Sequence, residues 1–175
     1  MPRTIGLDLS LTDSGLVSIT PHAIEVHRVK SKPNGSLYAD ASARIERIVG
    51  QLQTLIVIAE PELVIIESPA LASKTGQAHT RAWHWGATYD MVRGLGIPVL
   101  TATPQAVKMY ATGSGNADKD EVLAAVVRRY PDVAITNNNT ADAYVLAAMG
   151  QRRLGGQIED SLPKTHLRAM ERLSA

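Results

Sequence analysis

The sequence predicts an α/β fold with a five-stranded mixed sheet, in which three antiparallel strands are followed by parallel strands, and with helices flanking the sheet. Three observations support this fold class. The first thirty residues contain three short β-rich runs separated by turn signals. Two later runs, 62–68 and 97–102, are almost entirely apolar, as central strands covered on both faces are. Stretches with helical periodicity separate and follow these runs.

The N-terminal strands are expected at 3–10, 15–20 and 23–29. The letters "LTDS" separate the first two runs and "PH" separates the last two. Asp, Ser and Pro are typical of turns, so short connections are expected here. The three runs therefore predict an antiparallel meander.

Helices account for most of the remaining chain. Residues 39–58 place apolar side chains at helical spacing and form one stripe that can pack on the sheet. A helix over 76–94 is expected to connect the two apolar strands, because parallel strands need a crossover connection. Further helices are expected at 103–110, 118–130 and 140–153.

The length of 175 residues favours a single domain, which we place at 1–154, followed by a C-terminal tail at 155–175. The tail follows a Gly-Gly break and contains apolar residues, so two interpretations stay open: a loose segment with a short helix, or a segment docked on the body. There are no cysteines, so a metal ion would be held by oxygen or imidazole ligands. The N-terminus lacks a signal-peptide pattern and no apolar run is long enough to span a bilayer, so we expect a cytoplasmic protein without a membrane partner.

Three acidic residues stand in apolar surroundings. Asp8 lies inside the first strand, Glu67 ends the run "LVIIE", and Asp142 lies in the apolar helix "TADAYVLAAM". Each has an ordinary structural explanation: a turn-capping aspartate, the first polar residue after a buried strand, and a surface position. Burying an unpaired carboxylate costs several kcal/mol, however, and three together would repel one another unless a cation lay between them.

Such a cluster fits a hard divalent cation, because Mg²⁺ prefers oxygen ligands and keeps coordination positions open for water and phosphate. Carboxylate sites that hold two such ions catalyse in-line phosphoryl transfer. The three residues therefore predict a hydrolase that cleaves phosphodiester bonds with two Mg²⁺ ions per site, for which Mn²⁺ could substitute.

Four motifs in order extend this interpretation: "IGLDLSLTDSG", "LVIIESPALASKTGQAHTRA", "GIPVLTATPQAVKMYATGSGNADKDEV" and "NNTADAYVLAAM". Together they cover residues 5–149 and resemble the RuvC-type Holliday junction resolvases. The resemblance implies a ribonuclease H-like fold and a homodimeric, Mg²⁺-dependent endonuclease. Its substrate would be branched DNA, namely the four-way junction of recombination and repair, cut by paired symmetrical nicks.

Carried over position by position, the resemblance makes Asp8, Glu67 and Asp142 catalytic metal ligands. The fourth ligand of the family, usually Asp or His, falls on Asn139, one helical turn before Asp142. A neutral amide can bind a metal through its carbonyl oxygen or orient a water, and neighbouring Asn137 or Asn138 could share this role. The resemblance also places Lys119 in the catalytic set.

Candidate DNA contacts follow from the same motifs. Lys108 and Lys119 match lysines that serve DNA phosphates, with solvated helix surface as the alternative. The Gly- and Ser-rich loop at 112–118 could bring backbone N–H groups to a phosphate at the following helix start. The full set of DNA-binding candidates is Lys108, Lys119, Lys74, Arg81, Ser114 and Leu71. A wider basic rim would add Lys30, Lys32, Arg128 and Arg129, unless these are only solvated surface.

Two departures from the family pattern bear on substrate choice. Leu9-Ser10 replaces the usual Pro-Gly pair after the first aspartate. No aromatic residue follows Glu67 closely to stack on opened bases, and Leu71 is the candidate apolar wedge instead. Trp83, Trp85, His79 and His84 on the next helix are expected to serve packing or the dimer interface rather than base stacking.

Three other functions stay open. A nuclease with broader substrate selectivity would also cut DNA flaps and forks. A sugar-kinase-like ATP-binding domain shares the first motif, but the chain is short for two lobes. A junction-binding protein with weak catalysis would result if Asn139 disabled the metal site.

Overall fold

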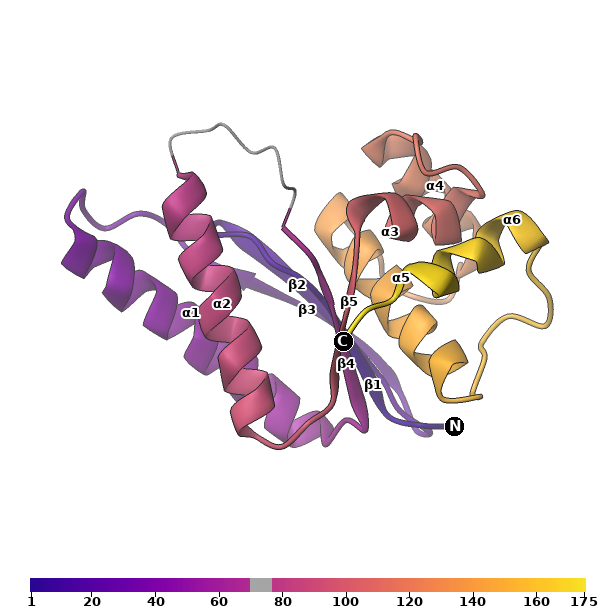
Figure 1. Ribbon diagram of the computed structural model, residues 1–175, viewed down its shortest axis with the longest axis horizontal. Helices are drawn as coiled ribbons and strands as arrows, with labels where there is room; N and C mark the ends of the chain where they lie inside the picture. The colour runs from indigo at the N-terminus through magenta and orange to yellow at the C-terminus, as the bar shows by residue number, and fades with distance from the viewer. Residues whose placement is uncertain (70–76) are drawn as a thin grey trace.

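A central sheet lies between two layers of helices in the computed structural model, which describes residues 1–69 and 77–175 (Figure 1). The strands are β1 (Thr4–Asp8), β2 (Asp13–Ile19), β3 (Ile24–Lys30), β4 (Leu63–Glu67) and β5 (Val99–Ala102). The helices are α1 (Tyr38–Ala59), α2 (Ala78–Gly94), α3 (Pro104–Thr112), α4 (Lys119–Arg129), α5 (Asn138–Arg153) and α6 (Lys164–Leu167), with a 3₁₀ helix η1 (Arg168–Arg172). Among these described helices, none has the length and apolar character needed to cross a membrane.

The sheet has the strand order β3-β2-β1-β4-β5. β1 pairs antiparallel with β2, and β2 pairs antiparallel with β3. β4 pairs parallel with both β1 and β5. This arrangement confirms the predicted mixed sheet of three antiparallel strands followed by parallel ones. Because β1 and β4 are parallel neighbours at the centre, their C-terminal ends lie side by side at one edge.

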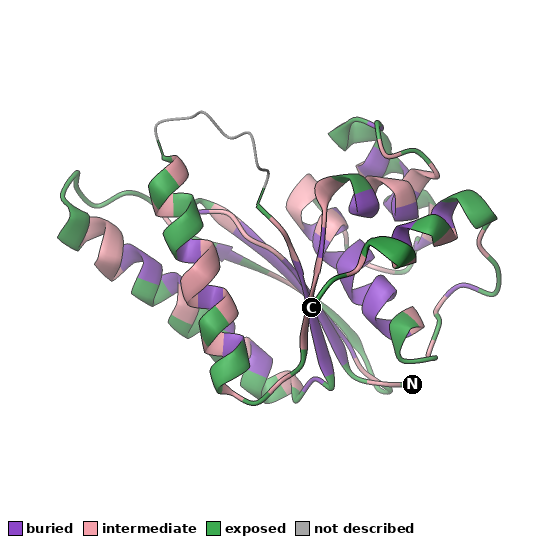
Figure 2. Cartoon of the chain, viewed as in Figure 1, coloured by how far each residue is buried: buried purple, intermediate pink, exposed green. Residues whose placement is uncertain are grey.

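Each face of the sheet has its own apolar core (Figure 2). On one face, residues of β1 and β4 such as Ile5 and Val64 pack against α1 and α2. On the other face, Ile65 packs with α3, α4 and α5. The alternation along the strands explains this division, because successive side chains point to opposite faces. The sheet is thus rigidly held on both sides.

Helix α5 lies directly against β1. Gly6 makes this possible: a side chain at this position would overlap the backbone oxygen of Ala143. Eleven residues of α5, from Thr140 to Gln151, are buried, so the helix is apolar on nearly all sides. The contact fixes α5 along the central strand, and with it the residues of its first turns.

The C-terminal segment docks on the body. Ser174 exchanges two backbone hydrogen bonds with Thr101 on β5, at 2.7 and 3.1 Å. Glu159 is buried and accepts hydrogen bonds from the hydroxyls of Tyr110 and Tyr130. The sequence left two interpretations open for residues 155–175, and in the structure this segment is docked on the body.

Candidate active site

The three predicted carboxylates converge on one edge of the sheet. Asp8 is the last residue of β1 and Glu67 the last of β4. The parallel register places Leu7 beside Ile66, so the two acidic residues that follow are neighbours across the strand pair. Asp142 stands in the second turn of α5, the helix that packs on β1. Three segments far apart in sequence therefore bring their carboxylates to one place.

Burial and mutual repulsion perturb all three carboxylates. Burial raises the pKa of Asp8 to about 6, and the charge of Asp13 adds to this rise. Burial, followed by the charges of Asp8 and Asp142, raises the pKa of Glu67 to about 8. Burial and the charge of Asp8 raise the pKa of Asp142 to about 7. The negative charges of the carboxylates repel one another, and burial disfavours their ionised forms. A bound cation would offset both effects.

In the part of the chain that the structure describes, no three Asp, Glu or His side chains lie close enough together to bind one metal ion. Like charges without a counter-ion keep apart, and aspartate and glutamate side chains move readily between rotamers.

Two lysines face the carboxylates. Lys119 is the first residue of α4, where Asp118 caps the helix and Glu121 completes a capping box. Its charge lowers the pKa of all three carboxylates, against the effect of burial. Lys108 on α3 acts in the same direction on Glu67 and Asp142. The structure thus brings both predicted lysines to the predicted acids.

A cleft of about 420 Å³ adjoins two of the three carboxylates, those of Asp8 and Glu67. Its lining includes Asp8, Glu67 and Lys119, together with Arg81 on α2. Trp85 forms another wall and donates a hydrogen bond from Nε1 to the backbone oxygen of Glu67 at 2.8 Å. This bond fixes the end of β4, and the ring also stacks on Tyr89, so Trp85 serves packing as expected from the sequence.

Asn139 sits at the start of α5, close to the turn that precedes β2. Its Nδ2 donates to the backbone oxygen of Asp13 at 2.5 Å, which directs the amide nitrogen away and leaves Oδ1 as the group available to a ligand. Asn137 is occupied as the N-cap of α5, because its Oδ1 accepts from Thr140 N at 2.9 Å. Asn138 keeps a buried Oδ1 without a hydrogen-bond partner among the described residues.

A hydrogen-bond relay that the sequence did not reveal locks the first turn of α5 to the sheet. Asp13, at the start of β2, accepts from Arg28 on β3 and from Asn137 Nδ2 at 3.1 Å. The Arg28 guanidinium, through hydrogen bonding, holds the pKa of Asp13 below its usual range. Asn137 in turn caps the helix that carries Asp142. The relay therefore connects strand β3 to the placement of the Asp142 carboxylate.

We expect Asp13→Ala to slow DNA cleavage about ten- to a hundredfold, because a small displacement of catalytic groups has effects of this size. Asp13→Asn should lose less, since its amide oxygen can still accept from Asn137. Single-turnover cleavage assays measure both. Glu25→Ala is the matched control, because Glu25 pairs with His27 on the same sheet at 3.6 Å and, among the described residues, forms no ion pair with α5. Equal rates for Asp13→Ala and Glu25→Ala would contradict the positioning role.

The turn between β1 and β2 is held by a second set of bonds. Arg44 on α1 is buried and donates to the backbone oxygen of Leu11 and, at 2.8 Å, to Ser31 Oγ. Ser14 Oγ donates to the backbone oxygen of Ser10 at 2.7 Å. These side-chain bonds stabilise the turn in which Leu9-Ser10 replaces the Pro-Gly pair of the family, directly after Asp8.

His84 on α2 is buried, with 1% of its surface exposed, and lines the cleft next to Trp85. Its Nε2 has no hydrogen-bond partner among the described residues. Burial, with the charge of Arg44 as a second cause, lowers the pKa of His84 to about 4. The neutral form of the ring is therefore favoured, because burial disfavours the protonated, charged form.

This shift predicts a pH-dependent loss of stability on the acid side. Below the ordinary pKa of histidine, about 6.5, the unfolded chain takes up a proton that the folded protein refuses until about pH 4. Between these values the contribution of His84 should fall by about 3 kcal/mol. Chemical denaturation of wild type and His84→Asn at several pH values isolates this contribution as a difference. A constant difference between pH 7 and pH 4.5 would contradict the prediction.

The remaining candidates divide into three groups. Arg81 lines the carboxylate cleft, whereas Ser114 lines a different cavity beside α4. Leu71 and Lys74 lie outside the described residues. Trp83 has 43% of its surface exposed on α2, in contrast to Trp85.

Comparisons with known proteins give a consistent family match. The family model described as "Crossover junction endodeoxyribonuclease RuvC" matches residues 4–149. A protein of that name from Rhodococcus opacus is 32% identical over 154 residues, covering 83% of this chain and 78% of the relative. A "Thermus thermophilus RuvC structure" superposes with a TM-score of 0.68 at 25% identity, covering 88% of this chain and 97% of that one. The fold of "T. thermophilus RuvC in complex with Holliday junction substrate" agrees as well, with a TM-score of 0.72 at 24% identity and coverage of 89% and 98%.

Proposed function

The chain belongs to the RuvC family of crossover junction endodeoxyribonucleases, and on this premise we propose that it resolves four-way DNA junctions by nicking two symmetry-related strands. The observation that carries the proposal is the convergence of Asp8, Glu67 and Asp142 on one rigid edge of the sheet. Their chemistry suits phosphodiester hydrolysis, and the match extends over residues 4–149.

The donor set fits a divalent cation. All three side chains offer carboxylate oxygens, which Mg²⁺ and Mn²⁺ prefer, and each has a raised pKa that a nearby positive charge would lower. Asp8, Glu67 and Asp142 would hold the ions, with Asn139 contributing its amide oxygen. Two such ions, when bound, supply activation of a water and stabilisation of the leaving oxygen.

The protein's own groups then have separate tasks. Asp8 and Asp142 lie on different elements and would flank the attacking water, so that the rigid contact between β1 and α5 sets its direction. Lys119 and Lys108 place positive charge beside the carboxylates, where a scissile phosphate would bring further negative charge. Arg81 in the adjoining cleft would contact the DNA backbone.

Paired incision is best explained by a homodimer. A two-fold axis in the protein matches the two-fold symmetry of a four-way junction, so that two equivalent sites meet two equivalent phosphates. We place this activity in the cytoplasm, the location expected from the sequence.

A nuclease with broader selectivity is the second candidate. The sequence after Glu67 reads Ser68-Pro69-Ala70-Leu71, without the aromatic residue that the family uses at the junction centre. The two functions separate in one cleavage assay with equal concentrations of an immobile four-way junction, a Y-fork and a linear duplex. Preferential cutting of the junction supports resolution. Equal cutting of junction and fork selects the broader enzyme, and junction binding without nicking in Mg²⁺ or Mn²⁺ selects a binding protein.

A further inference from the structure

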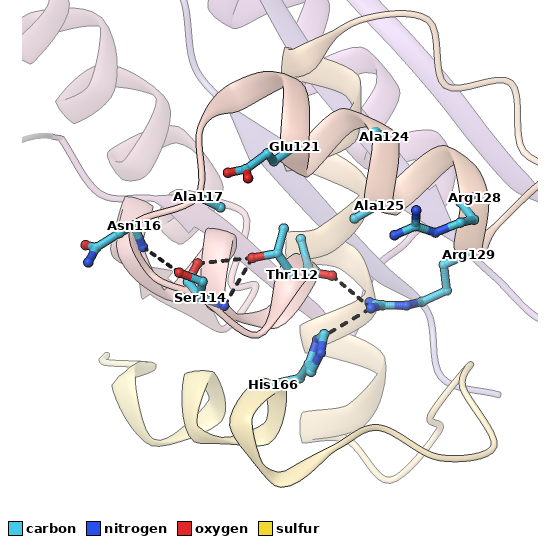
Figure 3. Close-up of a pocket in the computed structure, with 11 residues that line it drawn as sticks. Thr112, Ser114, Asn116, Ala117, Glu121, Ala124, Ala125, Arg128, Arg129 and His166 are labelled. Atoms are coloured by element: carbon cyan, nitrogen blue, oxygen red, sulfur yellow. Dashed lines mark hydrogen bonds between the residues drawn. The ribbon is translucent and has the colours of Figure 1, made fainter.

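A second cavity, of about 680 Å³, lies between the end of α3, the start and body of α4, and α6 (Figure 3). Figure 3 shows the side chains of Arg128 and Arg129 and the ring of His166 at one side of this cavity. The hydroxyl-bearing residues Thr112 and Ser114 line another part of its wall. The cavity therefore brings two guanidinium groups and the hydroxyl of Ser114 to a common space, while the Thr112 hydroxyl bonds to the backbone oxygens of Lys108 and Ser114.

The charges of the two arginines are balanced only in part. Within the described ranges 1–69 and 77–175, neither Arg128 nor Arg129 forms an ion pair. Arg129 donates instead to the backbone oxygens of Tyr110 and Ala111, at 3.3 and 2.8 Å. Glu121 also lines the cavity, but its carboxylate accepts from Asp118 N at 2.7 Å as part of the helix cap. The cavity thus carries two guanidinium charges against the one carboxylate of Glu121, which is engaged in the helix cap.

The two arginines differ in how freely they can reach a ligand. Arg129 is partly buried and tied to the end of α3, so it is a fixed charge at the base of the cavity. Arg128 is exposed and makes no hydrogen bond or ion pair with any of the described residues. His166 has its Nδ1 2.8 Å from the backbone oxygen of Tyr110, which holds the ring in place at the edge. Arg128 is therefore the group that can turn toward an anion.

This cavity is separate from the catalytic cleft. Lys119 and Arg128 stand nine positions apart on α4. At 3.6 residues per turn, nine residues are two and a half turns, which places the two side chains on opposite faces and about 14 Å apart along the axis. Lys119 accordingly lines the cleft with the carboxylates, while Arg128 lines the second cavity.

We propose that the cavity between α3, α4 and α6 binds a backbone phosphate of the DNA, with Arg128 as the residue that contacts it. The proposal rests on the proposed function, which supplies DNA as the ligand. A guanidinium group matches phosphate geometry through paired N–H donors, and Ser114 on the cavity wall offers a hydroxyl. Free inorganic phosphate has the same chemistry, so the experiment must distinguish the two sources. The enzyme would then contact the DNA backbone at a second place, on the face of α4 that points away from the scissile bond.

The test measures binding of a fluorescent four-way junction by anisotropy at several salt concentrations, with a chelator present so that no strand is cut. Arg128→Gln should weaken binding about fivefold near 0.1 M salt and reduce the slope of log K against log salt by about 0.9, the value for one phosphate contact. Arg153→Gln is the matched control, because Arg153 is also an exposed arginine in the last turn of a helix but lies outside this cavity. Its affinity and salt slope should equal those of the wild type.

A second experiment distinguishes a DNA phosphate from free inorganic phosphate as the ligand. It measures the melting temperature of each protein with and without inorganic phosphate. The proposal is overturned if Arg128→Gln binds the junction within twofold of wild type with an unchanged slope. If phosphate stabilises the wild type but not Arg128→Gln while junction affinity is unchanged, the cavity takes free anions and the DNA contact is also refuted. A wild-type protein that binds no junction at all would refute the proposed function itself, which is a different result.

Discussion

Asp8→Asn is expected to lower the rate of junction cleavage by about a thousandfold while leaving junction binding nearly unchanged. Metal-ion catalysis supplies several kcal/mol of transition-state stabilisation, and each 1.36 kcal/mol changes the rate about tenfold. The substitution keeps the size of the side chain but removes the charge at the end of β1. The lysines that would contact phosphate stay in place. Single-turnover cleavage and anisotropy with the same junction measure the two effects separately.

A second measurement connects this loss with the metal. Mg²⁺ binding to the folded protein should raise the melting temperature of the wild type, since a ligand that prefers the folded state stabilises it. The rise should be much smaller for Asp8→Asn. If the variant nicks the junction at the wild-type rate, Asp8 is not a metal ligand. If both proteins show the same Mg²⁺-dependent rise, the cation binds elsewhere.

Gly15→Ala is expected to lower cleavage at least a hundredfold, without any change to a charged or polar side chain. Gly15 pairs with Asp8 across the two strands. A methyl group at this position would overlap the backbone oxygen of Asn139 and lie 2.7 Å from its carbonyl carbon. The first turn of α5 would have to move away from β2, and a shift of about 1 Å in catalytic groups can cost a hundredfold in rate. Overpacking should also reduce the free energy of unfolding by about 1–3 kcal/mol.

Gly50→Ala provides the control for this prediction. Gly50 lies within α1, and a methyl group there meets no atom within 4 Å. Replacing an exposed helical glycine by alanine should stabilise the protein by about 0.5–1 kcal/mol and leave cleavage unchanged. Cleavage rates and urea midpoints of both variants test the pair. Normal cleavage by a stably folded Gly15→Ala protein would show that the close contact with α5 does not set the geometry of the site.

The central part of the site could be predicted from sequence because its residues violate the local pattern. A carboxylate inside an apolar strand or helix is visible in one dimension, and Asp8, Glu67 and Asp142 all stand out in this way. The sheet was predictable for a similar reason, since buried parallel strands and the antiparallel meander have different apolar patterns. The strand order and orientations confirm it.

The supporting groups could not be predicted because nothing in their neighbourhood is unusual. Asp13 stands among turn residues, where aspartate is ordinary. Its partners lie 15 residues away at Arg28 and 124 residues away at Asn137. The first strand was expected to continue to Ser10, but it ends at Asp8 because Ser10 bonds to the side chain of Ser14 instead of extending the ladder.

The C-terminal segment shows the same limit. Its apolar residues are compatible with both a loose and a docked arrangement. The docked arrangement buries the acidic residue Glu159, which the sequence alone would place on the solvent-exposed surface. The carboxylate of Glu159 accepts hydrogen bonds from the hydroxyls of Tyr110 and Tyr130. It also accepts one from Arg152 Nη2 at 2.9 Å. The polar cluster forms only when three distant parts of the chain meet.

The central claim is that this chain resolves four-way junctions with divalent ions held at Asp8, Glu67 and Asp142. The most direct test uses an immobile junction with each of its four strands labelled in turn, incubated with Mg²⁺ or with a chelator. The account predicts nicks at symmetry-related positions on two opposite strands in Mg²⁺, with 5′-phosphate ends, and no nicks in the chelator. Cutting in the chelator, or random cutting of all four strands and of a linear duplex at the same rate, would contradict it.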